Sequence, residues 1–315
     1  MARCSVIIVT YNSGAHIERC LRALASQDCE IVVVDNASHD DTIARVQALA
    51  QEISVQLITI SRNVGFAAGV NQGARAAGGE VLLILNPDAV AEPHALEEML
   101  TCMATSGAAA VGGALLESDG HVAQGFVFRR LPTLASLLGE VLLVNQLWPG
   151  NPVNRRYRCL DADTSLAQQV EQPAGACLAV TRAAWDKLQG MDIAFYPVWF
   201  EDVDLCARLR DSGERIWYCP TARFQHSGAH SVGMLSFRDK QSFWYANMLR
   251  YAGKHFATWQ VVVLRVGIVL GMGLRMLASM LGAKPKGVAL GDAMRGYAHA
   301  ASLAFRSVEK GGAQS

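Results

Sequence analysis

The first hundred residues alternate between short apolar runs and helix-like segments, and no other feature of the chain restricts its fold as strongly. The apolar runs are Val6–Val9, Ile31–Val34, Val55–Ile60 and Val81–Leu85. Strands that are apolar throughout are typical of parallel sheets covered by helices on both faces. We therefore predict an α/β fold with a Rossmann-like, doubly wound mixed sheet, in which ligands bind beyond the carboxyl ends of the strands.

The segments between these runs predict helices. Residues 15–25 place Ile17, Leu21 and Leu24 on one helical face. Ser38 and Asp41 have the spacing of a capping box, which predicts a helix that opens there and continues to about residue 51.

Three glycines, Gly65, Gly69 and Gly73, recur every four residues. On a helix they form one smooth stripe, which allows close approach of either a sheet or a ligand. The stripe is not the G-x-G-x-x-G dinucleotide fingerprint, and that fingerprint is also missing after the first apolar run. This argues against an enzyme that uses a nicotinamide cofactor.

Composition narrows the class of protein. The 315 residues are 51% apolar, and Lys plus Arg equals Asp plus Glu, so neither a disordered chain nor a nucleic-acid partner is expected. The chain enters a strand by Ser5, which leaves no room for a signal peptide and predicts that the catalytic part faces the cytoplasm. Scattered cysteines without a C-x-x-C pair indicate reduced, buried thiols: Cys4, Cys20, Cys29, Cys102, Cys159, Cys177, Cys206 and Cys219.

Changes in pattern along the chain predict three regions, 1–106, 107–232 and 233–315. The third is a helical extension with a strongly apolar segment, Phe256–Gly282, that contains Arg265 and Arg275. Because a spanning helix needs about 20 apolar residues, these charges favour a helix at a membrane surface or in a bundle. Gly267 and Gly271 in the same segment have the spacing of a helix-pairing motif.

Two acidic residues follow strands of the predicted sheet. Asp35 accepts hydrogen bonds either from a nucleotide or from the backbone of its own turn, and its position allows both. Asp88 ends the triplet Asn86-Pro87-Asp88. A divalent cation bound to a diphosphate commonly takes one or two carboxylates from the protein, so Asp88 suits that role; the alternative is a helix-capping acid.

A third acidic group, Glu201, Asp202 and Asp204, follows an aromatic run that ends in Trp199 and Phe200. Acids at a helix start are favoured by the helix dipole, which is one explanation. Three acids in four residues exceed that need, and their mutual repulsion would raise one pKa toward that of a general base. The aromatic rings beside them would offer a surface on which a sugar stacks.

His226 and His230 follow Cys219, but a structural zinc site would need a fourth ligand and tighter spacing. His226 alone either adds a nitrogen ligand to a cation at Asp88 or is a satisfied loop histidine.

Taken together, residues 4–230 resemble a family 2 glycosyltransferase with a GT-A fold, of the rhamnosyltransferase-like kind. Five segments in the expected order carry the resemblance: Val6–Ser13, Val34–Ser38, Asn63–Asn71, Asn86–Asp88 and Glu201–Leu205. One departure is Asn86, because the usual triplet has Asp at both ends. Rhamnosyltransferase-like members often have the Asn-Pro-Asp form, so the departure bears on the donor sugar and on the strength of metal dependence.

The resemblance implies a role for each matching position. Asp202 would be the catalytic base, with Glu201 beside it; Asp88 and His226 would hold Mg²⁺ or Mn²⁺. Acceptor contacts would come from Trp199, Phe200 and Gly175. Thr10 and Asp35 would contact the nucleoside, and the remaining residues around the nucleotide sugar would be Tyr11, Asn12, Asn63, Gly69, Asn71 and Asn86.

The activity implied is inverting transfer of L-rhamnose from dTDP-rhamnose to a hydroxyl of a lipid-linked or cell-surface glycan, at the inner face of the cell membrane. A UDP-hexose donor, or a sugar-nucleotide-binding protein without catalysis, are the alternatives. A polymerising synthase would need several spanning helices and a Gln-x-x-Arg-Trp segment, and the sequence has neither.

Overall fold

The computed structural model describes residues 3–226, 228, 233 and 235–306. The chain divides into two compact units. The first, here the sheet unit, comprises residues 1–131, 158–193 and 201–231. The second, the helical unit, comprises residues 132–157, 194–200 and 232–315.

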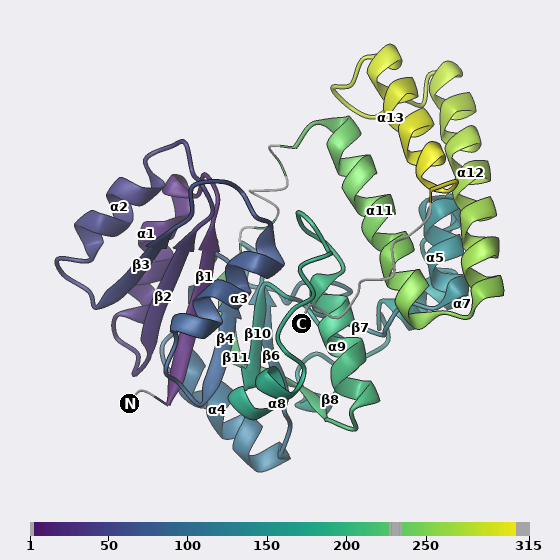
Figure 1. The fold of residues 1–315 in the computed structure, drawn as a ribbon. Coiled ribbons are helices and arrows are strands. Elements are labelled where there is room, and N and C mark those ends of the chain that lie inside the picture. Colours follow the sequence, from purple (N-terminus) through teal and green to yellow (C-terminus); the bar gives the residue numbers. More distant parts are fainter. Residues whose placement is uncertain (1–2, 227, 229–232, 234, 307–315) are drawn as a thin grey trace. The chain divides into compact units, whose positions relative to one another are not determined.

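The first half of the main sheet is parallel, as the alternating pattern predicts. Its strands are β1 (Cys4–Thr10), β2 (Glu30–Asp35), β3 (Val55–Thr59) and β4 (Val81–Leu85), in the spatial order β3-β2-β1-β4 (Figure 1). Since these strands run in one direction, the residues that follow Thr10, Asp35 and Leu85 lie at one edge of the sheet.

The second half makes the sheet mixed, because β10 runs antiparallel to both of its neighbours, β4 and β6. Beyond β6, the long strand β11 runs parallel to it, and short strands pair antiparallel with β11. β7 and β9 form a separate two-stranded sheet. The bounds are β5 (Ala89–Ala91), β6 (Ala110–Leu116), β7 (Phe128–Arg129), β8 (Gln168–Gln169), β9 (Gln172–Pro173), β10 (Cys177–Thr181) and β11 (Ile216–His226).

Helices of the sheet unit pack on both faces of the parallel strands. Val6 and Ile8 of β1 join the core under α1, whereas Ile7 and Val9 face α3. A β-carbon on Gly73 would lie 2.5 Å from Ile7 Cγ2, and one on Gly69 would lie 2.9 Å from Val9 Cγ1. The glycine stripe therefore packs on the sheet. The helices are α1 (Gly14–Leu24), α2 (Thr42–Leu49), α3 (Phe66–Ala76), α4 (Ala95–Ser106), α8 (Arg182–Lys187) and α9 (Glu201–Asp211).

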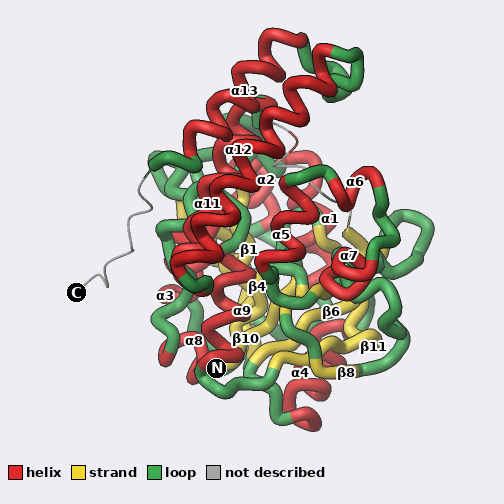
Figure 2. Tube along the Cα trace, turned by 90° about the vertical axis from the view of Figure 1, so that its right-hand side faces the viewer, coloured by secondary structure: helices red, strands yellow, loops and turns green. Residues whose placement is uncertain are grey.

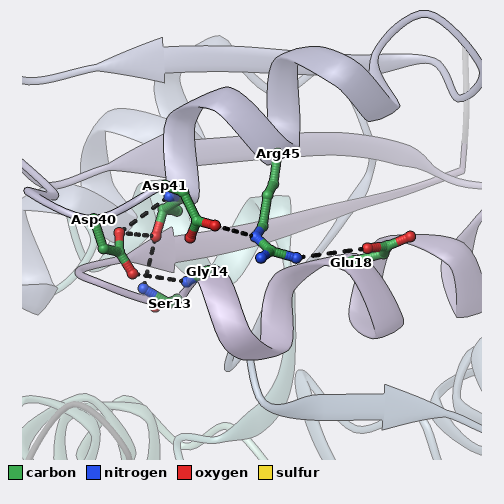
Figure 3. A network of polar contacts seen from close by, with 7 residues as sticks. Ser13, Gly14, Glu18, Asp40, Asp41 and Arg45 are labelled. Carbon is green, nitrogen blue, oxygen red and sulfur yellow. Dashed lines mark hydrogen bonds and ion pairs between the residues drawn. The ribbon is translucent and has the colours of Figure 1, made fainter.

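The predicted capping box at Ser38 is wrong. Helix α2 begins at Thr42, and the Ser38 hydroxyl instead donates to the carboxylate of Asp35, 2.6 Å away. Asp40 organises the start of the helix by accepting from the backbone of Gly14 and from Thr42 (Figure 3). Ser38 is diverted because the buried carboxylate of Asp35 needs donors more than the exposed start of the helix does.

Arg45 of α2 joins this network to α1. Its guanidinium binds Asp41 at 2.7 Å and lies 3.9 Å from Glu18 of α1 (Figure 3). These pairs are half exposed, so each contributes little to stability, and their effect is to fix the two helix starts together.

The described part of the helical unit has helices joined by loops and no strand (Figure 2). Helix α12 packs on α5 at the two glycines of the predicted pairing motif: a β-carbon on Gly267 would lie 2.5 Å from Leu138 Cδ2, and one on Gly271 would meet the carbonyl of Val141. The helices are α5 (Leu134–Val141), α6 (Val144–Leu147), α7 (Pro152–Tyr157), α11 (Phe237–His255), α12 (Thr258–Met280) and α13 (Leu290–Leu303).

Candidate active site

Asp35 lies fully buried at the carboxyl end of β2. Thr10 donates to its Oδ2 over 2.9 Å, and the backbone of Ser38 donates to its Oδ1 over 2.9 Å. Both oxygens therefore have partners inside the protein, and Thr10 is itself buried. In this arrangement the two residues organise the strand-end loops; nucleoside contact by them stays a prediction.

Asparagines link the loops at the same edge. Asn12 has a positive φ of 51° and accepts from the backbone of His39, while the Asn63 side chain accepts from Asn36 at 3.0 Å. The half-buried Tyr11 donates its backbone N–H to Ser13. These bonds hold the loops after β1, β2 and β3 in a fixed relation.

Two residues predicted to bind the nucleotide sugar also have structural partners, and their ligand contacts stay predictions. Asn71 exchanges two hydrogen bonds with the backbone of Met191, at 2.7 and 2.9 Å. Gly69 faces Val9 of the sheet, so its missing side chain is explained by close packing.

The structure brings together the two residues predicted to hold a cation. Asp88 follows β4 and His226 ends β11, yet His226 Nε2 lies 3.4 Å from Asp88 Oδ1. Burial alone would raise the pKa of Asp88, but the close contact with His226 and its charge outweigh burial and hold that pKa below its ordinary value. Asn86 stands nearby in sequence, with its backbone N–H bonded to the carbonyl of Ala176.

The pair fits a cation that also binds a diphosphate. Nε2 of His226 is buried without a hydrogen-bond partner, and an ionised carboxylate stands beside it. Within the described residues there is no group of three or more potential metal ligands. His230, the other histidine considered for zinc, lies outside the described residues.

Asp202, at the start of α9, is held by backbone and amide donors. Gly175 N–H donates to its Oδ2 over 3.0 Å, Gln172 Nε2 reaches the same oxygen at 3.4 Å, and Val203 N–H donates to Oδ1 at 2.8 Å. Burial raises the pKa of Asp202, and these hydrogen bonds partly offset the effect. A carboxylate with a raised pKa and a fixed orientation suits a general base.

Gly175 was predicted to contact the acceptor, and the structure shows it against Asp202. A β-carbon there would lie 2.8 Å from Asp202 Cβ and 2.9 Å from its Oδ2. The glycine is thus needed for the close approach of the base.

The other two acids of the cluster differ from Asp202. Burial, with the charge of Asp202 second, raises the pKa of Glu201 well above its ordinary value, and its Oε2 has no hydrogen-bond partner. Burial therefore favours the protonated form of Glu201. Asp204 is fully buried and pairs with Arg208 at 2.8 Å, so it is structural.

The aromatic residues before α9 belong to the helical unit. Phe200 is 5% exposed and packs against Trp244 and Tyr251, which leaves little of its ring for a sugar. Trp199 is half-buried and meets Trp244 edge-on. Acceptor contact therefore remains a prediction for Trp199, whereas the ring of Phe200 is occupied by packing.

Sequence reasoning missed Gln172, Arg129 and Phe126. Gln172 touches the base, and the ring of Phe126 stacks on His226 with centroids 5.8 Å apart and an interplanar angle of 9°. No local pattern marks these residues, because they reach the site only through long-range pairing of the sheet.

Comparison with known proteins agrees with the geometry. Residues 5–152 match the family model described as Glycosyl transferase family 2. An N-acetylglucosaminyl-diphospho-decaprenol L-rhamnosyltransferase of Mycobacterium tuberculosis is 28% identical over 271 residues, covering 81% of this chain and 86% of that protein.

Solved structures show the same fold at low sequence identity. The mannosyltransferase PcManGT from Pyrobaculum calidifontis, in complex with GDP-Man and Mn²⁺, superposes with a TM-score of 0.55 at 17% identity, over 96% of this chain and 86% of that one. S. aureus TarS 1–349 in complex with UDP-GlcNAc gives 0.55 at 16% identity, over 95% and 90%.

The mixed sheet thus has the GT-A fold of solved glycosyltransferases. Within that class, residues 5–152 match glycosyltransferase family 2, and the chain is similar to an L-rhamnosyltransferase.

Proposed function

We propose that the protein transfers L-rhamnose from dTDP-rhamnose to a hydroxyl of a lipid-linked glycan, with inversion at the anomeric carbon. The observation that carries the reaction type is the placement of two acidic sites in one unit, an ionised Asp88 beside His226 and a half-buried Asp202 with a raised pKa. The sugar and the acceptor class follow the activity after which the mycobacterial relative is named.

In this mechanism Asp202 accepts the proton of the acceptor hydroxyl. The acceptor oxygen forms its bond to the anomeric carbon as the bond from that carbon to the diphosphate breaks, and dTDP leaves with the bonding electrons. Glu201, whose protonated form is favoured by burial, positions the base or the acceptor. Mg²⁺ or Mn²⁺ bound by Asp88 and His226 would neutralise charge on the diphosphate, which is worth several kcal/mol.

The experiment is a panel of sugar nucleotides assayed for binding, hydrolysis and transfer, with and without Mn²⁺, beside Asp88→Ala. We expect metal-dependent turnover of dTDP-rhamnose, lost in the variant. Turnover of a UDP-hexose instead would correct the donor. Binding to a donor without hydrolysis or transfer, in the presence of metal and glycolipid acceptors, would favour a binding protein.

The lipid-linked acceptor is supported by helix α12, which by length and composition is long and apolar enough to cross a membrane. Arg265 and Arg275 do not lie free on it: Arg265 donates to the carbonyl of Ala304, and Arg275 to those of Glu140 and Val141. The opposite face is an uncharged exposed stripe: Trp259, Val262, Val266, Leu270, Leu274 and Leu277.

Charge around this stripe favours an anionic membrane surface. Although the whole chain is neutral, residues 232–306 have only Asp239 and Asp292 as acids. A helix with one apolar face in a cationic region is typical of binding in the plane of a membrane with anionic lipids. The cations are Arg238, Lys240, Arg250, Lys254, Arg265, Arg275, Lys284, Lys286, Arg295 and Arg306.

A flotation assay tests this part separately from turnover. The full chain should float with vesicles that contain phosphatidylglycerol and less with phosphatidylcholine alone. The double variant Val266→Glu, Leu270→Glu should stay in the soluble fraction, whereas Leu147→Glu, which changes an exposed leucine of α6, should float normally. Equal flotation of all three would contradict α12 as the membrane face.

A further inference from the structure

The two-stranded sheet of β7 and β9 lies beside the base. Its antiparallel register places Arg129 opposite Gln172. Gln172 reaches Asp202 Oδ2 at 3.4 Å, and Gly175, shortly after β9, donates to the same oxygen at 3.0 Å. This small sheet therefore positions two groups that touch the base, and Arg129 is the charged residue across from one of them.

Arg129 is fixed by its own contacts. Its Nε donates to the carbonyl of Gly125 over 2.7 Å, and its guanidinium carbon lies 5.9 Å from the centre of the Phe126 ring. The side chain is half-buried, so its charge is only partly screened by water. Burial raises the pKa of Asp202, and the charge of Arg129 acts in the opposite direction.

Phe126 connects this cation to the other acidic site. Its ring stacks on His226, and His226 lies 3.4 Å from Asp88. Arg129 therefore lies next to the Phe126 ring, which stacks on His226, and its positive charge acts on Asp202.

We propose that Arg129 is a positioning residue of the transfer reaction, which keeps Asp202 ionised and able to accept a proton within its buried surroundings. The proposal rests on the proposed function, because it takes Asp202 as the base. The other titratable groups that interact with Asp202 are Glu201 and Cys206 of its own helix, while Gln172 of β9 is neutral. Arg129 is the cation of this set.

The test is the pH dependence of kcat/KM for Arg129→Met and Arg129→Lys, with Arg130→Ala as the matched control. Arg130 is the next residue, but it is exposed and pairs with Glu171. Loss of the cation should move the acidic limb of the profile upward by about one pH unit, so that kcat/KM on that limb falls about tenfold while the plateau value at higher pH changes little. The Lys variant should recover most of the shift, and the control should not move.

Two results would overturn the proposal. One is an unmoved acidic limb in Arg129→Met with wild-type melting temperature and dTDP affinity. The other is an equal loss at every pH with weaker dTDP binding, which would place Arg129 on the donor's phosphates instead. If Met at this position prevents folding, Arg129→Gln, which still has a donor for Gly125, gives the same readout. Continued turnover by Asp202→Asn would instead refute the base assignment, and so separates the two failures.

Discussion

The surroundings of the two acidic sites in the sheet unit shift their pKa values in opposite directions. Asp88, just beyond β4, has a histidine beside it, and its pKa is lowered despite burial. Burial raises the pKa values of Glu201 and Asp202 at the start of α9. The comparison teaches that partners rather than residue type decide the pKa: under the proposed function, one carboxylate would stay ionised to hold positive charge and the other would take up a proton.

Among variants that remove this difference between the two sites, Asp202→Asn should have the largest effect on the rate of transfer. The amide keeps the size of the side chain but accepts no proton, so transfer should fall by about a thousandfold, the range of general base catalysis. Donor binding, measured by titration with dTDP, should stay within about threefold of wild type because Asp88 and His226 are unchanged. Near-normal turnover would show that the base lies elsewhere.

A smaller loss is expected from Gly175→Ala, which moves the base without removing it. The new β-carbon would lie 2.8 Å from Asp202 Cβ, so the carboxylate must shift. A displacement of a catalytic group by about 1 Å costs up to about a hundredfold in rate, and we expect a loss of ten- to a hundredfold in kcat. Gly150→Ala is the control, since its added carbon meets nothing within 4 Å. Equal kinetics for the two variants would contradict the role of Gly175.

The smallest effect on rate is expected from Glu201→Gln. This variant should be more stable than wild type at high pH. Because burial favours the protonated form of Glu201, replacing it with the neutral amide should change kcat by less than about threefold. In the wild type, the unfolded chain releases the proton of Glu201 above about pH 4.3, while the folded chain retains it to a higher pH, so stability falls as pH rises through this window. Glu201→Gln has no titrating group at this position, so its stability lacks this pH dependence. It should melt higher than wild type at pH 8 and at the same temperature at pH 4. A strong loss of activity would show that Glu201 acts as an ionised group.

The fold of the first hundred residues could be predicted because each strand there is a local apolar run with a polar end. The mixed second half could not be ordered from sequence, since β10 inserts between β4 and β6 through long-range pairing. The pairing of Asp88 with His226 followed from the family resemblance, not from any local pattern.

The remaining errors also have physical causes. Ser38 was assigned to a helix start because its hydrogen bond to the buried carboxylate of Asp35 cannot be predicted from the sequence. Sugar contact by Phe200 stays a prediction, and the packing of its ring on Trp244 of α11 was not visible in sequence because the two residues are 44 positions apart. The pair of Asp204 and Arg208, four residues apart on one helix, was readable and would have removed Asp204 from the catalytic cluster.

The interleaving of the two units has a practical consequence for producing the protein. The helical unit is assembled from three separate stretches, two of which precede residue 201. A fragment that ends at residue 231 would retain every predicted site residue, but it would strip α5 of α12 and of the donors that Arg275 supplies to Glu140 and Val141. The uncovered surface of α5 would then promote aggregation. A soluble form is better sought by polar substitution along the exposed stripe of α12 than by shortening the chain.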